Sequence, residues 1–402
     1  MSALPVGWEV LPLEAIAEVR LGRQRSPKNH AGDHMRPYVR AANVGWRGLL
    51  LNDVKMMNFT DAEMEVYRLL EGDLLLNEAS GSAAEVGKPA IWRGEIEDCA
   101  FQNTLIRVRP RAIESDYLLH YFRYTAMRGG FAAASRGVGI HHLGRETLSS
   151  WEVPCPPPRE RKRIVDVLDR ADALRAQRRE ALMLLDRLFQ SAFHSAFGDP
   201  IKNDRGWPVT VVAEAGRVQL GRQRAPQYQT GKYSTPYVRV ANVYENQIDL
   251  SDLLAMDFGA ADFSNYQLKH GDILLNEGQS IELVGRPAMW RDEIENCCFQ
   301  NTLVRFQARR ELVNPSFALA VFLAYFRSGE FSKISSKTSN VAHLGASRFS
   351  AMPFPVPPLH LQEKFAKQAS MIERLKAAHQ ASLAELDALF ASLQDRAFRG
   401  AL

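Results

Sequence analysis

The sequence predicts a mixed α/β (α+β) fold in which one globular domain occurs twice and each copy is followed by a long helix. Two observations carry this prediction: the chain repeats itself, and each repeat ends in a long stretch without Gly or Pro. A length of 402 residues suits two or three domains. With 46% hydrophobic and 24% charged residues, the chain can bury a core, which excludes global disorder.

The repeat stays in register along the whole chain. Pro37–Val44 returns as Pro236–Val243, and Val86–Arg107 returns as Val284–Arg305 with 16 of 22 positions identical. Chance does not produce such matches in series, so we interpret the chain as a tandem duplication. The predicted parts are a globular domain at 1–153, a helix at 154–198, a second globular domain at 199–352 and a second helix at 353–402.

The globular part of each copy mixes short strands with helices. In the first copy, Tyr38–Arg40, Leu74–Leu76 and Leu105–Val108 are strand candidates bounded by Gly, Pro, Asn and Asp. A helix is predicted to start at Ser115 in copy one and at Asn314-Pro315 in copy two, where capping residues precede apolar residues at helical spacing.

A proline-rich turn then leads into the long helix of each copy, at Arg159–Phe197 and Leu359–Arg399. Apolar residues recur at alternating steps of 3 and 4, which is typical of a coiled-coil seam. The helix-pairing candidates are Ile164, Leu168, Leu182, Leu185 and Phe189, with Phe365, Ile372, Leu383, Leu386 and Phe390 in the second copy.

A helix of that length spans about 58 Å and needs a partner for its apolar stripe. The nearest candidate is the other copy, which predicts two antiparallel coiled-coil helices that hold the globular domains apart. The alternative is that each helix packs on its own domain.

Sequence motifs for catalysis are missing. Gly81–Lys88 comes nearest to a phosphate loop, but it has five residues between its glycines where the motif has four, and Pro89 replaces the magnesium-binding Ser or Thr. Asp53-Val54-Lys55 resembles a nuclease element, yet copy two has Leu254 there, which favours a surface strand. Cys and His residues show no zinc-like spacing. We therefore expect no cofactor, no metal and no catalysis by this chain alone.

Charge and cysteine content indicate the setting in which the chain works. The net charge of +4 permits nucleic-acid binding without demonstrating it. No apolar run approaches the ~20 residues of a membrane span, and the N-terminus does not resemble a signal peptide. The four cysteines form no CxxC pair, so we expect a cytoplasmic protein with reduced thiols.

Polar residues shared by the two copies are candidates for DNA contact. Asn77-Glu78 ends an apolar run, and Gln102-Asn103 lies between Phe101 and the next one. Asn and Gln can bond adenine in the major groove, and Glu can accept from cytosine. The same side chains also satisfy buried backbone in turns, and both interpretations remain open. The shared arginines suit phosphates or surface ion pairs equally well.

At this point the chain resembles the DNA specificity (S) subunits of type I restriction-modification systems. The resemblance rests on the repeat with its long helices and on two framework stretches, GDLLLNEASGSAAEVGKPAIW with CAFQNTLIRVRP, and GDILLNEGQSIELVGRPAMW with CCFQNTLVRFQ. Gln362-Glu363 is similar to the family's helix start, whereas copy one has Arg161-Lys162 there.

The resemblance implies a non-catalytic subunit whose two target-recognition domains each read half of a split target in double-stranded DNA. It also implies docking of two modification subunits, which carry S-adenosylmethionine and methylate adenine, and of up to two ATP-dependent restriction subunits. The competing hypotheses are a scaffold that binds protein or sugar, and a self-contained methyltransferase or nuclease.

The DNA-binding candidates fall in corresponding positions of the two copies. They are Arg23, Arg25, Arg40, Asn43, Asn77, Glu78, Ser80, Lys88, Gln102, Asn103, Arg136 and His142 in copy one, and Arg222, Arg224, Arg239, Asn242, Asn276, Glu277, Gln279, Arg286, Gln300, Asn301, Lys337 and His343 in copy two.

Because the copies are so similar, we expect related half-sites on opposite strands, separated by an unread gap of roughly 5–8 base pairs. Loops that differ between copies, such as Ala79–Glu85 against Gly278–Leu283, would make the half-sites match only in part.

Overall fold

The computed structural model describes residues 5–135, 140–338 and 341–402, so Arg136 lies outside the described residues. The chain divides into two compact units. Unit 1 comprises 1–179 and 381–402, and unit 2 comprises 180–380. Each unit therefore holds one globular domain together with half of each long helix.

The globular part of unit 1 is built around a four-stranded antiparallel sheet in the order β2-β11-β7-β9. A second sheet, β10-β3-β6, forms a separate lobe in which β10 runs parallel to β3. The strands of these two sheets are β2 (Ala17–Leu21), β11 (Leu105–Pro110), β7 (Leu74–Asn77), β9 (Pro89–Ile91), β10 (Ala100–Phe101), β3 (Met35–Val39) and β6 (Lys55–Asn58).

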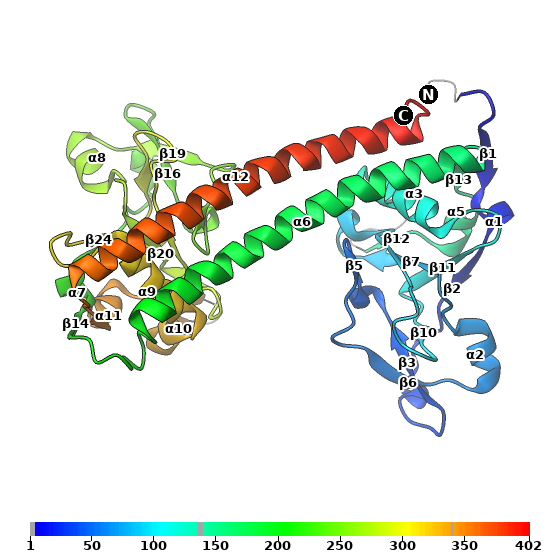
Figure 1. Ribbon diagram of the computed structural model, residues 1–402, viewed down its shortest axis with the longest axis horizontal. Coiled ribbons are helices and arrows are strands. Elements are labelled where there is room, and N and C mark those ends of the chain that lie inside the picture. The colour runs from blue at the N-terminus through cyan, green and yellow to red at the C-terminus, as the bar shows by residue number, and fades with distance from the viewer. Residues whose placement is uncertain (1–4, 136–139, 339–340) are drawn as a thin grey trace. The chain divides into compact units, whose positions relative to one another are not determined.

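Three two-stranded ladders make up the other described strands of unit 1, and the elements can be followed in Figure 1. The ladders are β1 (Glu9–Pro12) with β13 (Glu152–Cys155), β12 (His141–His142) with β8 (Ala79–Ser80), and β4 (Val44–Gly45) with β5 (Gly48–Leu49). The helices are α1 (Leu13–Ile16), α2 (Asp61–Tyr67), α3 (Ser115–Met127), α4 (Gly130–Ala134), α5 (Arg145–Ser149) and α6 (Pro158–Phe197).

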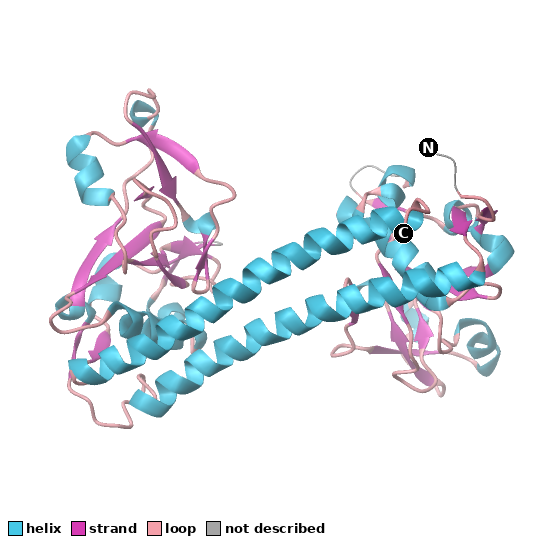
Figure 2. Ribbon diagram, turned by 45° about the horizontal axis from the view of Figure 1, so that its top comes forward, coloured by secondary structure: helices cyan, strands magenta, loops and turns pink. Residues whose placement is uncertain are grey.

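Unit 2 repeats this architecture, with sheets β15-β24-β20-β22 and β19-β16-β23 and the ladders β14-β27, β17-β18 and β21-β26-β25. Its strands are β14 (Val209–Val211), β15 (Gly216–Leu220), β16 (Ser234–Val238), β17 (Val243–Tyr244), β18 (Gln247–Ile248), β19 (Leu254–Asp257), β20 (Ile273–Asn276), β21 (Gly278–Gln279), β22 (Pro287–Met289), β23 (Cys298–Phe299), β24 (Leu303–Ala308), β25 (Ser336–Thr338), β26 (Val341–His343) and β27 (Pro353–Pro355). Its helices are α7 (Val212–Ala215), α8 (Ala260–Tyr266), α9 (Pro315–Arg327), α10 (Glu330–Ile334), α11 (Ala346–Ser350) and α12 (Leu359–Phe398). The mixture of strands and short helices in each unit is visible in Figure 2.

The long helices α6 and α12 pair antiparallel, which confirms the predicted fold class. In unit 1 the early part of α6 meets the late part of α12, where Arg175 Nε donates to Asp387 Oδ1 at 2.5 Å. In unit 2 the late part of α6 meets the early part of α12, where the Phe189 and Phe365 rings lie 5.5 Å apart.

Each helix also packs on globular elements, so the alternative of packing on the preceding domain holds together with pairing. Ile164 and Leu168 of α6 join the core of unit 1, and Phe365 of α12 joins the core of unit 2. Leu182, Leu185, Leu383 and Leu386 are half-buried.

The sequence did not reveal where the last turn of each long helix packs. The ring of Phe398 lies 5.8, 5.4 and 5.1 Å from the rings of Tyr117, Tyr121 and Tyr124 on α3. In unit 2, the Phe197 ring lies 4.8 Å from that of Phe317 on α9. The end of the chain thus docks on the domain that begins it.

Candidate DNA-reading site

Hydrogen bonds bring the polar loop ends of unit 1 together around Thr104. The Asn103 amide donates to the carbonyl of Arg23 at 3.0 Å, and the Glu78 amide donates to the carbonyl of Thr104 at 2.9 Å. The Ala41 amide donates to Thr104 Oγ1 at 3.0 Å. We call the loop ends at 22–23, 40–41, 78–80, 102–104 and 141–143 the loop-end surface of unit 1.

A close backbone approach holds this surface together at its first loop. A Cβ atom on Gly22 would collide with the carbonyl of Gln102, so only glycine lets the two segments meet there. Gly221 and Gln300 make the same approach in unit 2. An isolated parallel β-bridge joins Arg23 to Gln102 in unit 1, and a matching bridge joins Arg222 to Gln300 in unit 2.

Unit 2 repeats the surface around Thr302. The Asn301 amide donates to the carbonyl of Arg222 at 3.0 Å, and the Glu277 amide donates to the carbonyl of Thr302 at 2.9 Å. The Val240 amide donates to Thr302 Oγ1 at 3.0 Å. The loop-end surface of unit 2 therefore comprises 221–222, 239–240, 277–279, 300–302 and 342–344.

A glutamate and a histidine meet at one edge of each surface. His142 Nδ1 lies 3.2 Å from both carboxylate oxygens of Glu78, and His343 Nδ1 lies 2.9 Å from Glu277 Oε2. Their backbones also join, because the amide after each histidine donates to the carbonyl of the glutamate at 2.8 Å. The sequence predicted these residues separately and did not predict that they pair.

The strands beside this pair differ between the units. In unit 1, half-buried Ser80 on β8 faces His141 on β12. In unit 2, half-buried Gln279 on β21 faces Ala342 on β26, and β25 adds a third strand that carries exposed Lys337. The structure thus places a shared pair next to neighbours that are specific to each copy.

Most of the candidate arginines form hydrogen bonds or ion pairs within their own unit. Arg23 donates to the carbonyl of Asn58 at 2.6 Å, and Arg40 binds Asp53 at 2.7 Å. Their counterparts behave alike: Arg222 is buried and pairs with Asp262 at 2.7 Å, and Arg239 pairs with Asp252 at 2.5 Å. Arg25 and Arg224 are exposed.

Four candidate asparagines are buried. Asn43 accepts from the Arg40 amide at 3.0 Å and donates to the carbonyl of Leu50 at 2.8 Å, and Asn242 makes the equivalent bonds. These two side chains hold the turn before β4 or β17. Asn77 and Asn276 are 4% and 0% exposed, and the Oδ1 atom of each has no partner among the described residues.

Most of the remaining candidates are half-buried. Gln102, Asn103, Gln300 and Asn301 are half-buried in the tight turns of the loop-end surfaces. Lys88 is buried and pairs with Glu85. Its counterpart Arg286 stacks 4.8 Å over the ring of Tyr244, and burial lowers the pKa of its guanidinium.

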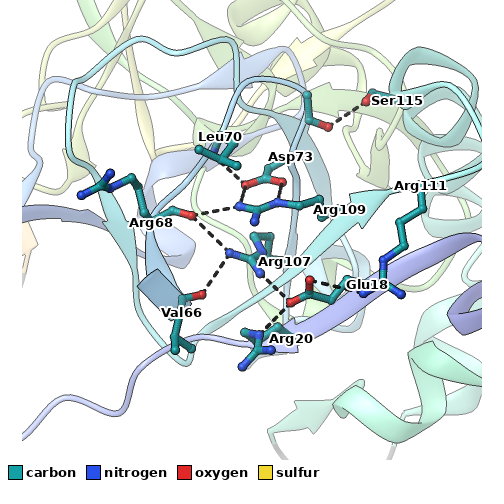
Figure 3. A network of polar contacts seen from close by, with 11 residues as sticks. Glu18, Arg20, Val66, Arg68, Leu70, Asp73, Arg107, Arg109, Arg111 and Ser115 are labelled. Carbon is teal, nitrogen blue, oxygen red and sulfur yellow. Dashed lines mark hydrogen bonds and ion pairs between the residues drawn. The ribbon is translucent and has the colours of Figure 1, made fainter. Parts of the chain in front are cut away.

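A buried charge network under the surface of unit 1 was not foreseen from the sequence (Figure 3). Arg107 is 1% exposed and donates to Glu18 Oε1 at 2.8 Å and to the carbonyls of Val66 and Arg68 at 3.1 and 3.2 Å. Hydrogen bonding by Arg20 lowers the pKa of Glu18, and Arg107 also lowers it. The network ties the end of α2 to the central sheet.

Arg109 extends the network because two of its nitrogens donate to the Asp73 carboxylate, at 2.7 and 2.8 Å. Unit 2 keeps the counterparts of Arg107 and Asp73, because buried Arg305 donates to the carbonyls of Gln267 and Asn265 and lies 3.3 Å from Asp272. Gln307 replaces Arg109 and donates to Asp272 at 2.9 Å. Burial raises the pKa of Asp272. The signal that could have revealed the network is that Arg107 and Asp73 recur as Arg305 and Asp272, within or directly before strands rich in apolar residues.

Three further features of the described residues bear on other functions. No described helix is long and apolar enough to cross a membrane. No group of three or more His, Cys, Asp or Glu side chains suited to a metal ion occurs in the part of the chain that the structure describes. All four cysteines are buried and free, and burial raises the pKa of Cys99 to about 12.

Comparison with known proteins places the chain in a family. The family model described as "Type I restriction modification DNA specificity domain" matches residues 5–183 and 215–388. The type I restriction enzyme EcoKI specificity subunit of Escherichia coli (strain K12) is 21% identical over 427 positions, which cover 100% of this chain and 91% of the relative. The MjaVIII specificity subunit of Methanocaldococcus jannaschii is 20% identical over 80% of this chain and 75% of its own.

Two solved structures share the fold over nearly their whole length. The crystal structure of the type I restriction-modification S subunit from M. genitalium superimposes with a TM-score of 0.55 at 11% identity, covering 99% of this chain and 97% of that one. A chain from a study of complex assembly and conformational transition of the type I R-M system gives 0.56 at 17% identity, with 100% coverage of both. Because the family model covers most of both repeats, the chain belongs to the type I restriction-modification DNA specificity family and is the non-catalytic DNA specificity subunit of such a system.

Proposed function

We propose that each globular domain reads one half of a split target in double-stranded DNA through its loop-end surface. The observation that carries the proposal is that the same arrangement of loop ends is built twice by the same hydrogen bonds, around Thr104 and around Thr302. In this proposal residues 1–153 and 199–352 act as target-recognition domains, and 154–198 and 353–402 act as spacer helices.

The candidate residues divide into two groups by burial. We propose that exposed and half-buried residues contact DNA, whereas the buried Asn43, Asn77, Asn242 and Asn276 shape the surface from below. Buried Lys88 and Arg222 belong with these asparagines, because they form ion pairs with Glu85 and Asp262. Phosphate contacts position a protein on DNA and base contacts give sequence specificity. Exposed Arg25, Arg224 and Lys337 suit phosphates, and the loop-end polar groups suit base edges.

We further propose that two modification subunits dock on the chain, one for each repeat. Support comes from leucines that are about half exposed at corresponding positions of the long helices: Leu174 of α6 corresponds to Leu375 of α12, and Leu188 corresponds to Leu389. Unit 1 holds Leu174 and Leu389, and unit 2 holds Leu188 and Leu375. We assign them to a protein interface because they recur at matching positions of both copies. The proposal extends to two restriction subunits and to a cytoplasmic location, where the DNA target lies and free thiols stay reduced.

A salt titration of DNA binding tests the proposal. The complex of this chain with its modification subunits should bind a duplex carrying the mapped target, and log K should fall linearly with log salt concentration. Arg25→Ala and Arg224→Ala should each reduce the magnitude of the slope of log K against log salt concentration by about 1. Replacing exposed Lys162 of α6 by Ala should leave the slope unchanged. The proposal would be contradicted by a DNA affinity that does not change with salt concentration. A native mass measurement that finds a single modification subunit in the complex would also contradict it.

A further inference from the structure

We infer that Glu78 and Glu277 are base-reading residues, and that each requires a base whose amino group faces the major groove, cytosine or adenine, at a corresponding position of the two half-sites. The inference rests on the proposed function of the loop-end surfaces. His142 and His343 are then positioning residues, because each holds the carboxylate beside it.

Both glutamates are held rigidly before any ligand arrives. The amide of each donates to a threonine carbonyl at 2.9 Å, and its own carbonyl accepts from Leu143 or Leu344 at 2.8 Å. The side chain is then fastened to the histidine Nδ1. Two backbone bonds and one side-chain bond leave the carboxylate little freedom, so binding would cost little ordering entropy.

The carboxylates are nevertheless open to a ligand. The side chains of Glu78 and Glu277 remain 15% and 18% exposed, and the histidines beside them are 52% and 39% exposed. A carboxylate offers two oxygens with about four acceptor positions, and the histidine uses only part of that capacity. In unit 2 only Oε2 of Glu277 is within 2.9 Å of the ring.

The chemistry of the ionised carboxylate decides which bases it accepts. It can only accept hydrogen bonds, so in the major groove it suits the N4 amino group of cytosine or the N6 amino group of adenine. Guanine O6 and thymine O4 are hydrogen-bond acceptors, so each would face the carboxylate without a proton to share. Because both units carry the same pair, both half-sites share this requirement, whereas Ser80 and Gln279 beside it allow the neighbouring bases to differ.

A purely structural role for the pair gives a different expectation. Glutamate and histidine would then only fasten β12 or β26 to the central sheet. Glutamine at the same position keeps the length of the side chain and an oxygen for the histidine Nδ1–H. A structural role therefore predicts unchanged base preference in a glutamine variant.

The test is base-by-base binding or methylation by the complete complex with Glu78→Gln and with Glu277→Gln. Each variant should change the preference at one base pair of one half-site by roughly 10- to 100-fold, and each should leave the other half-site unchanged. Exposed Glu71→Gln in the same domain is the matched control and should change nothing.

Further variants separate reading from folding. Glu78→Asp retains the carboxylate, so the required base should stay the same even where affinity falls. His142→Ala should weaken discrimination at the same base pair, and His142→Gln should restore it by donating to the carboxylate. Unchanged preference in Glu78→Gln with DNA affinity intact would overturn the inference and leave the proposed function standing. Loss of salt-dependent binding by the parent complex would instead overturn the proposed function.

Discussion

The two long helices join their domains at the same position by different chemistry. The fourth residue of α6 is Arg161, which donates to Glu114 at 2.6 Å and to the carbonyl of Pro156 at 2.9 Å. The fourth residue of α12 is Gln362, which is fully buried, accepts from the Asn314 amide at 2.8 Å and donates to the carbonyl of Pro357 at 2.7 Å. An ion pair near the surface in one copy thus replaces a buried amide network in the other.

The same contrast continues along the helices. In unit 1 the sixth residue of α3, His120, bonds to Asp169 of α6 at 2.8 Å. In unit 2 the sixth residue of α9 is Ala320, and the position of Asp169 on α12 is occupied by Ser370. Duplication has therefore preserved the positions of these contacts while their chemistry diverged, with charged pairs in unit 1 and neutral residues in unit 2.

The largest expected effect lies in the aromatic cluster of unit 2. Phe365 packs against the rings of Phe189, Phe193 and Phe197 at 5.5 to 5.7 Å. Phe365→Ala should lower the free energy of unfolding by about 3–5 kcal/mol through loss of burial and a residual cavity. Denaturant titration measures this, with exposed Leu174→Ala as the control. A loss no larger than that of the control would show that α12 does not depend on this packing.

A smaller difference is expected where the two helices begin. Gln362→Ala leaves the Asn314 amide and two carbonyls without their partner, which should cost about 1–3 kcal/mol. Arg161→Ala should cost at most about 1 kcal/mol, because the Glu114 side chain is half exposed. If the two variants lose the same free energy of unfolding, the proposed difference between the first turns of α6 and α12 would be wrong.

The smallest expected effect concerns the acid stability that the His120–Asp169 pair gives to unit 1. Hydrogen bonding by His120 lowers the pKa of Asp169 below its ordinary value of 3.8. A lowered folded-state pKa stabilises the protein above the unfolded value and loses that contribution as the pH falls through the folded pKa. Asp169→Asn should therefore destabilise unit 1 by at most about 1 kcal/mol at neutral pH, and the difference should vanish in strong acid.

Ser370→Ala is the matched variant in unit 2, and its effect should not change with pH. Thermal unfolding followed from neutral pH to below pH 3.8 checks both variants. A cost of Asp169→Asn that persists unchanged in acid would mean that the carboxylate contributes no charge-dependent stability.

Much of the fold could be predicted because it depends on local patterns. The predicted strands at Leu74–Leu76 and Leu105–Val108 lie in β7 and β11, and α9 starts at Pro315 with Asn314 as its cap. The docking of Phe398 on α3 could not be predicted, since an apolar stripe shows that a partner exists without showing which surface it meets.

The candidate site could be predicted as a set of residues and not as an arrangement. Identity between the copies singled out Glu78, His142 and Gln102. Their meeting depends on backbone bonds between loops far apart in sequence, such as Glu78 to Thr104 and Leu143 to Glu78, which no local pattern encodes. Arg107 was missed because a charged residue on a strand usually faces solvent, whereas here Glu18 and two carbonyls compensate its burial.

The central claim is that each unit reads one half of a split DNA target, and methylation mapping in cells that express the complete complex tests it most directly. The parent should give two related half-sites on opposite strands with an unread gap of roughly 5–8 base pairs. Replacing Ala79–Glu85 by Gly278–Leu283 should move half-site one toward half-site two and leave half-site two unchanged. A continuous target, two wholly unrelated half-sites, or a change in both half-sites after the exchange would contradict the account.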